Sequence, residues 1–378
     1  MQYRRFGKLT WQVSALGFGA MRLPILGGDS GRVDEAAAIR MIRHAIDQGV
    51  NYIDTAYPYH QGQSEIVVGK ALQNGYRQKV KLATKSPLWL VRKQADFERF
   101  LQEQLAKLQT NGLDFYLLHA LDRDKWTQVQ SLHVFDWAKK ALASGQIKHF
   151  GFSFHDSFTV FKEIVDAYDW TFCQIQYNFL DVDFQAGRRG LEYAAKKGLA
   201  VVIMEPLRGG ELAQPPTAIQ QLWRQAKPQR TPVEWALQWL WDQPAVSTVL
   251  SGMSSLPQVK ENLASADRSG VNALTSQQRE TVEKVRQAYH QREGVPCTGC
   301  QYCLPCPSGV NIPRIFKIFN AAQMRGSRAQ ARQDYQNLDP GQRADQCRQC
   351  HRCEQTCPQA IKIATRLQQA HEFLTRQP

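Results

Sequence analysis

The sequence has no uninterrupted apolar run of the length that a membrane-spanning helix needs, which is about 18 residues. The charged segment from Met1 to Phe6 is not followed by the apolar stretch of a signal peptide. We therefore expect a cytoplasmic protein without a membrane partner.

Cysteine is nearly absent from the first 296 residues, where only Cys173 occurs, and the other eight of the nine cysteines follow. Because cytosolic thiols stay reduced, this chain is not expected to form a disulfide framework. The clustering of the eight late cysteines instead predicts metal binding. Cys173 falls inside a predicted strand, where we expect a buried apolar residue that binds no metal.

Acidic residues are in the minority, since 47 Lys and Arg face 34 Asp and Glu and give a formal charge of +13. The basic residues are spread along the chain without a nucleic-acid-binding motif, so nucleic acid is not an expected partner. Two oxidised cubane clusters, each carrying about −2 with its thiolates, would lower the charge of the folded protein to about +9. Such a surface suits an acidic redox protein or phosphorylated ligands.

Strand and helix signals alternate over about 270 residues, after a short hairpin at residues 3–6 and 11–14. The expected strands are 15–19, one beginning at residue 51, 80–85, 113–119, 149–153, 172–176, 200–204 and 247–251. The expected helices are 34–48, 64–73, 96–108, 129–143, 158–167, 188–197, 232–241 and 275–290. Eight strand–helix units with apolar strands predict an α/β fold of the (β/α)8 TIM barrel type.

A doubly wound parallel sheet is the alternative fold, because Gly17-Phe18-Gly19 begins like a dinucleotide fingerprint. The third glycine of that fingerprint is missing, however, and a loop follows in place of a helix. We therefore expect a barrel over residues 1–290. A small, mostly helical iron–sulfur domain is expected over residues 291–378, after a linker at residues 291–296.

Three successive predicted strands end in residues that can do acid–base chemistry, namely Asp54, Lys85 and His119. Active-site residues of barrels lie at the carboxyl ends of strands, so these side chains are expected to converge. Tyr59 follows Asp54 by five residues, and a lysine ammonium held by the Asp would lower the pKa of this phenol from about 10. A buried structural ion pair with a core histidine is the alternative interpretation.

The eight late cysteines form two similar groups. The pattern Cys-x2-Cys-x2-Cys with a Cys-Pro is specific for [4Fe-4S] clusters, and two copies exchange their fourth ligands. The region resembles the α-helical two-cluster ferredoxins. The resulting assignments are Cys297, Cys300, Cys303 and Cys357 for one cluster, and Cys347, Cys350, Cys353 and Cys306 for the other. Only two residues separate Cys303 from Cys306, where the second group has three, and zinc is the competing metal.

Residues 1–290 resemble the aldo-keto reductase family. The motifs that carry the resemblance are Asp54-Thr55-Ala56-x-x-Tyr59, Gly62-x-Ser64-Glu65, Leu117-Leu118-His119 and Lys260-Glu261-Asn262. The resemblance implies that a small aldehyde or ketone is reduced by hydride from a nicotinamide. It implies that Tyr59 is the general acid and that Lys85, anchored by Asp54, lowers the pKa of Tyr59. His119 would orient the carbonyl.

The same resemblance implies a set of cofactor-binding residues. They are Met21, Ser153, Gln174, Met204, Leu207, Gly209, Gly210, Ser254, Glu261 and Asn262. Phe154 and His155 follow Ser153 where the family has an Asn. The basic residues that hold the adenosine 2′-phosphate would fall near Gly252 and Gln258, which are not basic. We expect NADP(H), with NAD(H) as the alternative.

Two functions of different class remain open at this stage. One is a carbonyl reductase whose clusters serve stability, sensing or docking. The other is an electron-transfer module that links a pyridine nucleotide to a ferredoxin-like partner, although no flavin fingerprint is present to convert a hydride into single electrons. A redox-sensing subunit with little turnover is a third reading. Trp89, Trp126 and His60 lie on loops that are candidates for the substrate pocket wall.

Overall fold

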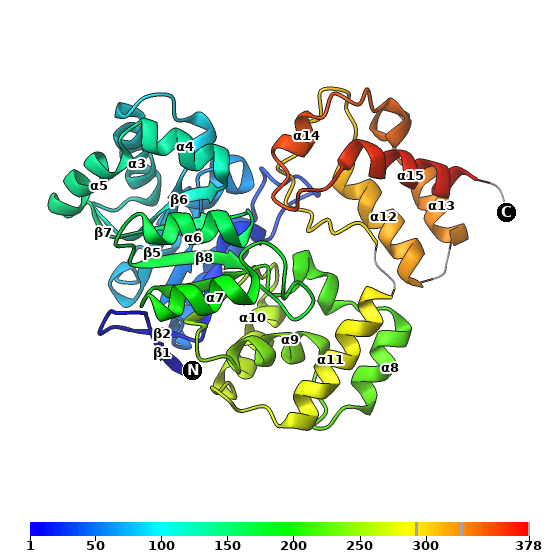
Figure 1. The fold of residues 1–378 in the computed structure, drawn as a ribbon, viewed down its shortest axis with the longest axis horizontal. Helices are drawn as coiled ribbons and strands as arrows, with labels where there is room; N and C mark the ends of the chain where they lie inside the picture. The colour runs from blue at the N-terminus through cyan, green and yellow to red at the C-terminus, as the bar shows by residue number, and fades with distance from the viewer. Residues whose placement is uncertain (292–293, 326–327, 377–378) are drawn as a thin grey trace. The chain divides into compact units, whose positions relative to one another are not determined.

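A computed structural model describes residues 1–291, 294–325 and 328–376 of the chain (Figure 1). It divides into two compact units, Met1–Pro206 with Ala236–Thr275 and Leu207–Trp235 with Ser276–Pro378. Residues 207–235 and 276–290, expected in the barrel domain, thus group with the C-terminal segment. The reason is that α8 (Thr217–Gln225) packs against α11 (Ser276–His290), which leads directly into that segment.

The first unit contains a closed barrel of eight parallel strands in the order β10-β3-β4-β5-β6-β7-β8-β9. This confirms the predicted barrel and excludes a doubly wound sheet. The strands are β3 (Leu16–Gly19), β4 (Tyr52–Asp54), β5 (Lys81–Ser86), β6 (Leu113–Leu121), β7 (Ile147–Phe154), β8 (Phe172–Gln176), β9 (Ala200–Met204) and β10 (Thr248–Ser251). Most of their residues are buried, as expected for parallel strands covered by helices on one side and packed inside the barrel on the other.

Helices follow the strands around the barrel (Figure 1). They are α1 (Glu35–Asp47), α2 (Gln63–Ala71), α3 (Ala95–Leu108), α4 (Arg123–Ser131), α5 (Val134–Ala143), α6 (Phe158–Asp166), α7 (Gly187–Lys196), α9 (Pro232–Trp241) and α10 (Leu256–Asp267). The single helix predicted over residues 129–143 is wrong, because His133 adopts a left-handed conformation (φ 51°) and separates α4 from α5. α10 was not predicted as a helix.

The predicted hairpin is confirmed as β1 (Tyr3–Arg5) paired antiparallel with β2 (Gln12–Ser14). It places Phe6, which is fully buried, among aromatic side chains of the barrel strands. The ring centroid of Phe6 lies 4.8 Å from that of Phe115 and 5.9 Å from those of Tyr52 and Phe172. The hairpin and this aromatic cluster fill the amino-terminal end of the barrel.

The second unit is helical, with α12 (Ile312–Arg325), α13 (Arg328–Gln336), α14 (Arg352–Gln355) and α15 (Ile363–Thr375) besides α8 and α11. On α12, which lies between the two cysteine groups, Ile312, Ile315, Phe316 and Phe319 are all buried and form an apolar stripe. Their core packs against six of the late cysteines. The predicted linker at residues 291–296 lies partly outside the described residues.

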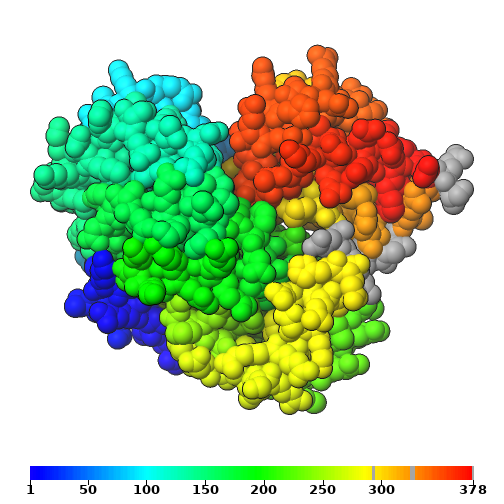
Figure 2. Space-filling view, in the orientation of Figure 1, coloured from blue at the N-terminus to red at the C-terminus, as the bar shows by residue number. Residues whose placement is uncertain are grey.

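Seven short 3-10 helices complete the described structure. They are η1 (Ala20–Arg22), η2 (Tyr59–Gly62), η3 (Arg77–Lys79), η4 (Leu88–Leu90), η5 (Arg208–Ala213), η6 (Pro340–Gln342) and η7 (Ala344–Gln346). Within the described residues, no helix combines the length and the apolar character that crossing a membrane requires. Figure 2 shows the molecular surface coloured along the chain.

Candidate active site

A buried ion pair joins the ends of two neighbouring strands. β4 and β5 pair in parallel with Asp54 opposite Ala83, so Lys85 lies just beyond Asp54 on the next strand. Lys85 Nζ donates to Asp54 Oδ1 at 2.6 Å and to the carbonyl oxygen of Thr55 at 2.8 Å. The side chains of Asp54 and Lys85 are 3% and 1% exposed. Burial raises the pKa of Asp54 and the ammonium of Lys85 opposes that shift, so each charge depends on the other.

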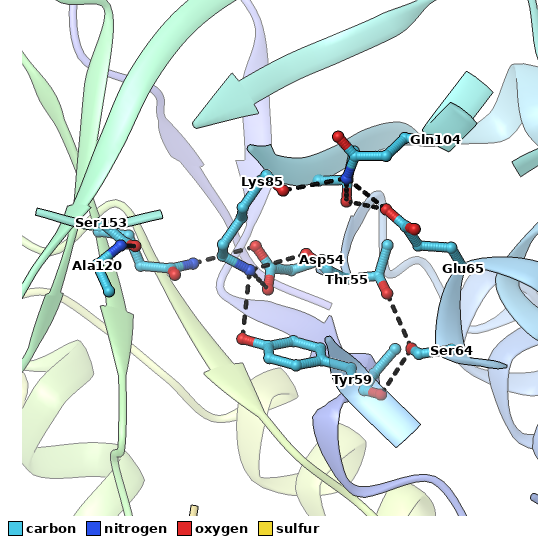
Figure 3. Close-up of polar contacts among 12 residues, drawn as sticks. Asp54, Thr55, Tyr59, Ser64, Glu65, Lys85, Gln104, Ala120 and Ser153 are labelled. Atoms are coloured by element: carbon cyan, nitrogen blue, oxygen red, sulfur yellow. Dashed lines mark hydrogen bonds and ion pairs between the residues drawn. The ribbon is translucent and has the colours of Figure 1, made fainter. Parts of the chain in front are cut away.

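Tyr59 lies beside this pair, at the start of η2. Its hydroxyl oxygen is 3.5 Å from Lys85 Nζ, which is the long limit of a hydrogen bond, and the same Nζ lies 5.0 Å from the Tyr59 ring centroid. The contact is therefore mainly electrostatic. Figure 3 shows the Tyr59 hydroxyl pointing toward the Lys85 ammonium. The structure brings together the phenol and the cation that the sequence pairs.

His60 holds the loop that carries Tyr59. His60 and Gln61 both have positive φ angles, 53° and 54°, which are uncommon for residues other than glycine. His60 Nε2 accepts from the Leu23 backbone N–H at 3.0 Å, so its Nδ1 carries the proton and donates to the Ser30 carbonyl at 2.8 Å. His60 thus fixes the loop, and its place in the wall of a substrate pocket stays a prediction.

His119 is the fourth residue of the set. It is 3% exposed and lies on β6, which runs two residues past it to Leu121. Its ring centroid is 6.1 Å from that of Tyr59 and 5.3 Å from that of Trp89. Burial lowers the pKa of His119 well below its usual value, and the nearby charge of Lys85 lowers it further. The imidazole is therefore neutral at pH 7.

Trp126 does not line this site. Its side chain is fully buried, and its Nε1 donates to Glu163 Oε1 at 3.1 Å. The interpretation of Trp126 as a wall of the substrate pocket is therefore wrong, because the residue is part of the packing around α4. Trp89 does contact the ring of His119, and it is 37% exposed.

Ser153 and Gln174 stand opposite each other on β7 and β8. Ser153 Oγ accepts from the Ala120 backbone N–H at 2.7 Å, and Gln174 Nε2 donates to Asp54 Oδ2 at 3.1 Å. These bonds tie Ser153 to the end of β6 and Gln174 to the end of β4. Met204 ends β9. Nicotinamide binding by these three residues stays a prediction.

The residues near the expected adenosine site are held by local bonds. Asn262 Nδ2 donates to Ser251 Oγ at 3.0 Å, and the Ser254 backbone N–H donates to Gln258 Oε1 at 2.8 Å. A Cβ placed on Gly252 would lie 3.2 Å from Arg22 Cγ, so the Arg22 side chain runs over this glycine. Glu261 on α10 is exposed, and Met21 is half-buried in η1. Arg22 was not predicted as a site residue. It lies near the start of the barrel sequence, and its contact is with Gly252 near the end of that sequence.

Leu207, Gly209 and Gly210 belong to the second unit. Gly209 and Gly210 have positive φ angles of 65° and 95° inside η5. A Cβ on Gly209 would lie 2.1 Å from the carbonyl oxygen of Thr298, a residue between Cys297 and Cys300. The loop predicted to contact cofactor phosphates therefore abuts the first cysteine turn within this unit. Its role in cofactor binding stays a prediction.

The first cysteine group converges in the structure. Burial raises the pKa of Cys303, and the neighbouring thiolates of Cys300, Cys297 and Cys357 raise it further. Because such coupling needs short distances, Cys357 of the second motif lies close to the first three cysteines. This grouping fits the four thiolates that a cubane requires.

The second group is similar but more exposed. Burial raises the pKa of Cys353 to about 11, and Glu354, Cys347 and Cys306 contribute to the rise. Cys306 thus lies with the second motif despite its shortened spacing. Cys350 is exposed. The assignment of all eight cysteines as ligands stays a prediction.

Across the described ranges, no group of three or more His, Cys, Asp or Glu side chains is arranged around a single metal ion. The ligands of one zinc ion lie about 2.3 Å from it, whereas the cysteines of a cubane bind different irons and stand farther apart. Cys173 is fully buried in β8, and burial raises the pKa of its thiol, as expected for a core residue.

Comparison with known proteins gives matches to both parts of the chain. Residues 15–287 match the model of the aldo/keto reductase family, and residues 296–362 match that of a 4Fe-4S dicluster domain. The uncharacterized oxidoreductase YqkF of Bacillus subtilis is 25% identical over 324 residues, which are 76% of this chain and 100% of the relative.

Solved structures agree with the family match. The holo form of aldo-keto reductase AKR11C1 from Bacillus halodurans has a TM-score of 0.63 at 28% identity, over 75% of this chain and 96% of that one. An aldo-keto reductase from Klebsiella pneumoniae in complex with NADPH has a TM-score of 0.62 over 75% of this chain and 95% of that one. At 23% identity, the latter likeness concerns the fold alone.

Proposed function

Because this chain belongs to the aldo/keto reductase family of oxidoreductases and carries a 4Fe-4S dicluster domain, we propose that it reduces a small aldehyde or ketone, with Tyr59 as the general acid. The observation that carries the proposal is the Lys85 ammonium, which contacts Asp54 at 2.6 Å and the Tyr59 hydroxyl at 3.5 Å. A bound nicotinamide supplies the hydride to the carbonyl carbon.

In this proposal, side chains of the protein carry out the proton transfer to the carbonyl oxygen. As the carbonyl oxygen gains negative charge, the Tyr59 hydroxyl donates its proton to that oxygen, and the Lys85 ammonium stabilises the phenolate that remains. Asp54 holds Lys85 in place by a bond that is shielded from water. His119 is neutral because burial lowers its pKa, so it donates a hydrogen bond to the same oxygen without a charge of its own.

The test of this proposal uses a panel of aldehydes and ketones under anaerobic conditions. Tyr59→Phe removes the proton donor and is expected to lower kcat by about 100-fold or more. Tyr57→Phe is the matched control, because the Tyr57 hydroxyl donates to Glu103 Oε2 at 3.1 Å on the helical shell. A Tyr59→Phe enzyme with wild-type turnover would overturn the proposed acid.

For the cofactor we propose NADP(H) rather than NAD(H). The support is Arg22, whose guanidinium-bearing side chain runs over Gly252 near the expected 2′-phosphate. The Klebsiella relative in complex with NADPH has the same fold. Arg22→Ala is expected to raise the KM for NADPH about tenfold and to leave the KM for NADH unchanged. Equal KM values for NADPH and NADH in the wild type would contradict the proposed preference for NADP(H).

We propose two [4Fe-4S] clusters on the eight late cysteines. The support is the pair of thiolate groups around Cys303 and Cys353 described above. Iron and sulfide analysis of anaerobically purified protein is expected to give about eight of each per chain. Values near four would show that one group lacks a cluster.

An electron-transfer function is the second candidate. It is favoured by the exposed Cys350, which is flanked by the exposed side chains of Arg348 and Arg352. Such a cationic rim suits an acidic redox protein in the cytoplasm as partner. If NADPH alone bleaches the cluster absorbance, the result supports the electron-transfer function. If NADPH is consumed only with an added carbonyl compound, carbonyl reduction is the activity.

A further inference from the structure

A buried polar network lies beside Lys85 and is made of Glu65, Gln104, Thr84 and Tyr116. The first three are fully shielded from solvent, as is the ring of Tyr116. The members come from four elements, α2, α3, β5 and β6. Figure 3 shows Glu65 and Gln104 on the side of Lys85 where its main-chain carbonyl points. The proposed reduction mechanism does not use any of these side chains.

Gln104 is the centre of this network. Its Nε2 donates to Glu65 Oε1 at 2.6 Å, to Thr84 Oγ1 at 3.1 Å and to the Lys85 carbonyl oxygen at 3.0 Å. Its Oε1 accepts from the Tyr116 hydroxyl at 2.7 Å. Both ends of the amide are bonded, so its orientation is fixed. Gln104 therefore holds the main chain of Lys85 from helix α3.

Glu65 is a second carboxylate near Lys85. Burial raises the pKa of Glu65, while bonds from Thr84 Oγ1 at 2.7 Å and from Gln104 oppose that rise. Lys107 Nζ lies 3.6 Å from Glu65 Oε2 and favours the ionised form as well. Burial lowers the pKa of Lys85, whereas Asp54 and then Glu65 raise it. The carboxylate of Glu65 therefore helps to keep Lys85 cationic.

We propose that Glu65 and Gln104 are positioning residues for the reaction at Tyr59. Gln104 fixes the backbone of Lys85, and Glu65 supplies a second negative charge that holds the buried ammonium in its charged form. This inference rests on the proposed carbonyl reduction, because only a charged Lys85 stabilises the Tyr59 phenolate. Without Glu65, the charged form of Lys85 would be stabilised by only one carboxylate, that of Asp54.

Several other ionisable groups face these two residues. Lys85 is faced by Asp54 on β4, Tyr59 on η2 and His119 on β6, and Tyr52 lies next to Asp54. Glu65 is faced by Lys107 on α3, Tyr57 before η2 and Tyr116 on β6. After Asp54, Glu65 is the carboxylate that raises the pKa of Lys85, so the direction of the pKa change on its removal is fixed. The pKa of Lys85 falls, and the enzyme loses activity at a lower pH.

The test compares Glu65→Gln with the wild type in kcat/KM profiles from pH 6 to 10. The alkaline limb is expected to shift downward by about 0.5 to 1 pH unit, with a change below about threefold at pH 6.5. An ultraviolet difference titration, with Tyr59→Phe subtracted, follows the phenol directly. Its apparent pKa is expected to rise in Glu65→Gln, because a neutral Lys85 no longer favours the phenolate.

Glu98→Gln is the matched control. Glu98 lies on α3, as does Gln104, and its carboxylate accepts from Trp137 and Gln102, not from the network. The profile of Glu98→Gln is expected to match the wild type. Gln104→Leu is expected to lower kcat about tenfold with little change in KM, since it frees the main chain of Lys85.

Two further outcomes keep the inference separate from the proposed function. If Glu65→Gln does not fold, Lys107→Met replaces it, and the alkaline limb is expected to move upward by a smaller amount, because the charge of Glu65 is then no longer offset by Lys107. Superimposable profiles of Glu65→Gln and the wild type would overturn the inference. Full activity of Tyr59→Phe would instead overturn the proposed function, whatever the profile of Glu65→Gln.

Discussion

The two chemical centres of this chain are held in different ways. In the barrel, Lys85 is fixed by side chains and main chain that are themselves buried, such as Asp54 and Gln104. In the second unit, the cysteines lie in short turns that pack against one helical core, and Cys350 is exposed.

This difference indicates when each centre is formed. The barrel site is complete in the protein alone, because the ammonium of Lys85 already has its carboxylate and its carbonyl oxygen. The cysteine groups hold thiols whose pKa is raised by burial, as for Cys303 and Cys353, and iron binds the thiolate form, so binding of iron displaces their protons. The predictions below use this contrast, beginning with the largest effect.

Substitution of Lys85 is expected to have the largest effect on the stability and activity of the barrel. Lys85→Met leaves the buried carboxylate of Asp54 without its partner, which is expected to lower the free energy of unfolding by about 3–5 kcal/mol. Carbonyl reduction is expected to fall by about 100- to 10,000-fold. Lys8→Met is the control, because Lys8 pairs with Asp169 at 2.9 Å on the exposed surface and should cost less than about 1 kcal/mol. Equal losses of unfolding free energy in Lys85→Met and Lys8→Met would contradict the expected difference between a buried and an exposed ion pair.

Removing iron should affect only the second unit. Anaerobic chelation is expected to raise the amide hydrogen exchange of α12 and α15 at least about tenfold, because their shared core packs on the cysteine turns. Exchange in β4, β5 and β6 is expected to stay as in the untreated protein. The measurement is exchange followed by mass spectrometry, and faster exchange in the barrel strands would show that its site also depends on iron.

The loop at Gly209 gives a smaller effect. Gly209→Ala places a Cβ 2.1 Å from the Thr298 carbonyl oxygen and forces the Cys297–Cys300 turn to shift. We expect lower iron content per chain and a stability loss of about 2 kcal/mol or more. Gly210→Ala is the matched control, because its φ is also positive, at 95°, yet nothing lies within 4 Å of the added Cβ. Iron loss of the same size in both variants would exclude the contact with Thr298 as the cause.

The most gradual effect is an acid dependence of the barrel. Burial lowers the pKa of the partly buried His155 to about 4, below the usual value of about 6.5. Between these values the unfolded chain binds a proton that the folded chain does not, so stability is lost as the pH falls from 6.5 to about 4. The loss is at most about 1.4 kcal/mol per pH unit. His155→Asn should flatten this part of the curve of unfolding free energy against pH.

The sequence predicted the parts of the site that depend on strand ends. Asp54, Lys85 and His119 each follow an apolar strand, and parallel strands bring their carboxyl ends to one edge. The predicted end of one strand was wrong, since β6 continues past His119 to Leu121 through the left-handed Ala120. The break at His133 between α4 and α5 was missed because the apolar periodicity continues across it.

The parts of the site that were not predicted depend on contacts between residues far apart in the sequence. Gln104 occupies the apolar stripe of α3, between Leu101 and Leu105, and a polar residue in such a stripe was a signal that could have revealed it. Arg22 over Gly252 left no local signal, because the two residues meet only when β3 and β10 close the barrel. Cys306, by contrast, was assigned to the second cysteine group from the sequence despite its irregular spacing, and it contributes to the raised pKa of Cys353.

The aromatic seal around Phe6 has a practical consequence. The β1–β2 hairpin closes the amino-terminal end of the cylinder, whereas Asp54 and Lys85 lie at the carboxyl ends of β4 and β5. Lys8 and Thr10 in the hairpin turn are exposed. A tether attached to a cysteine introduced at Thr10 would anchor each barrel by its amino-terminal end, away from the strand ends that carry Asp54 and Lys85.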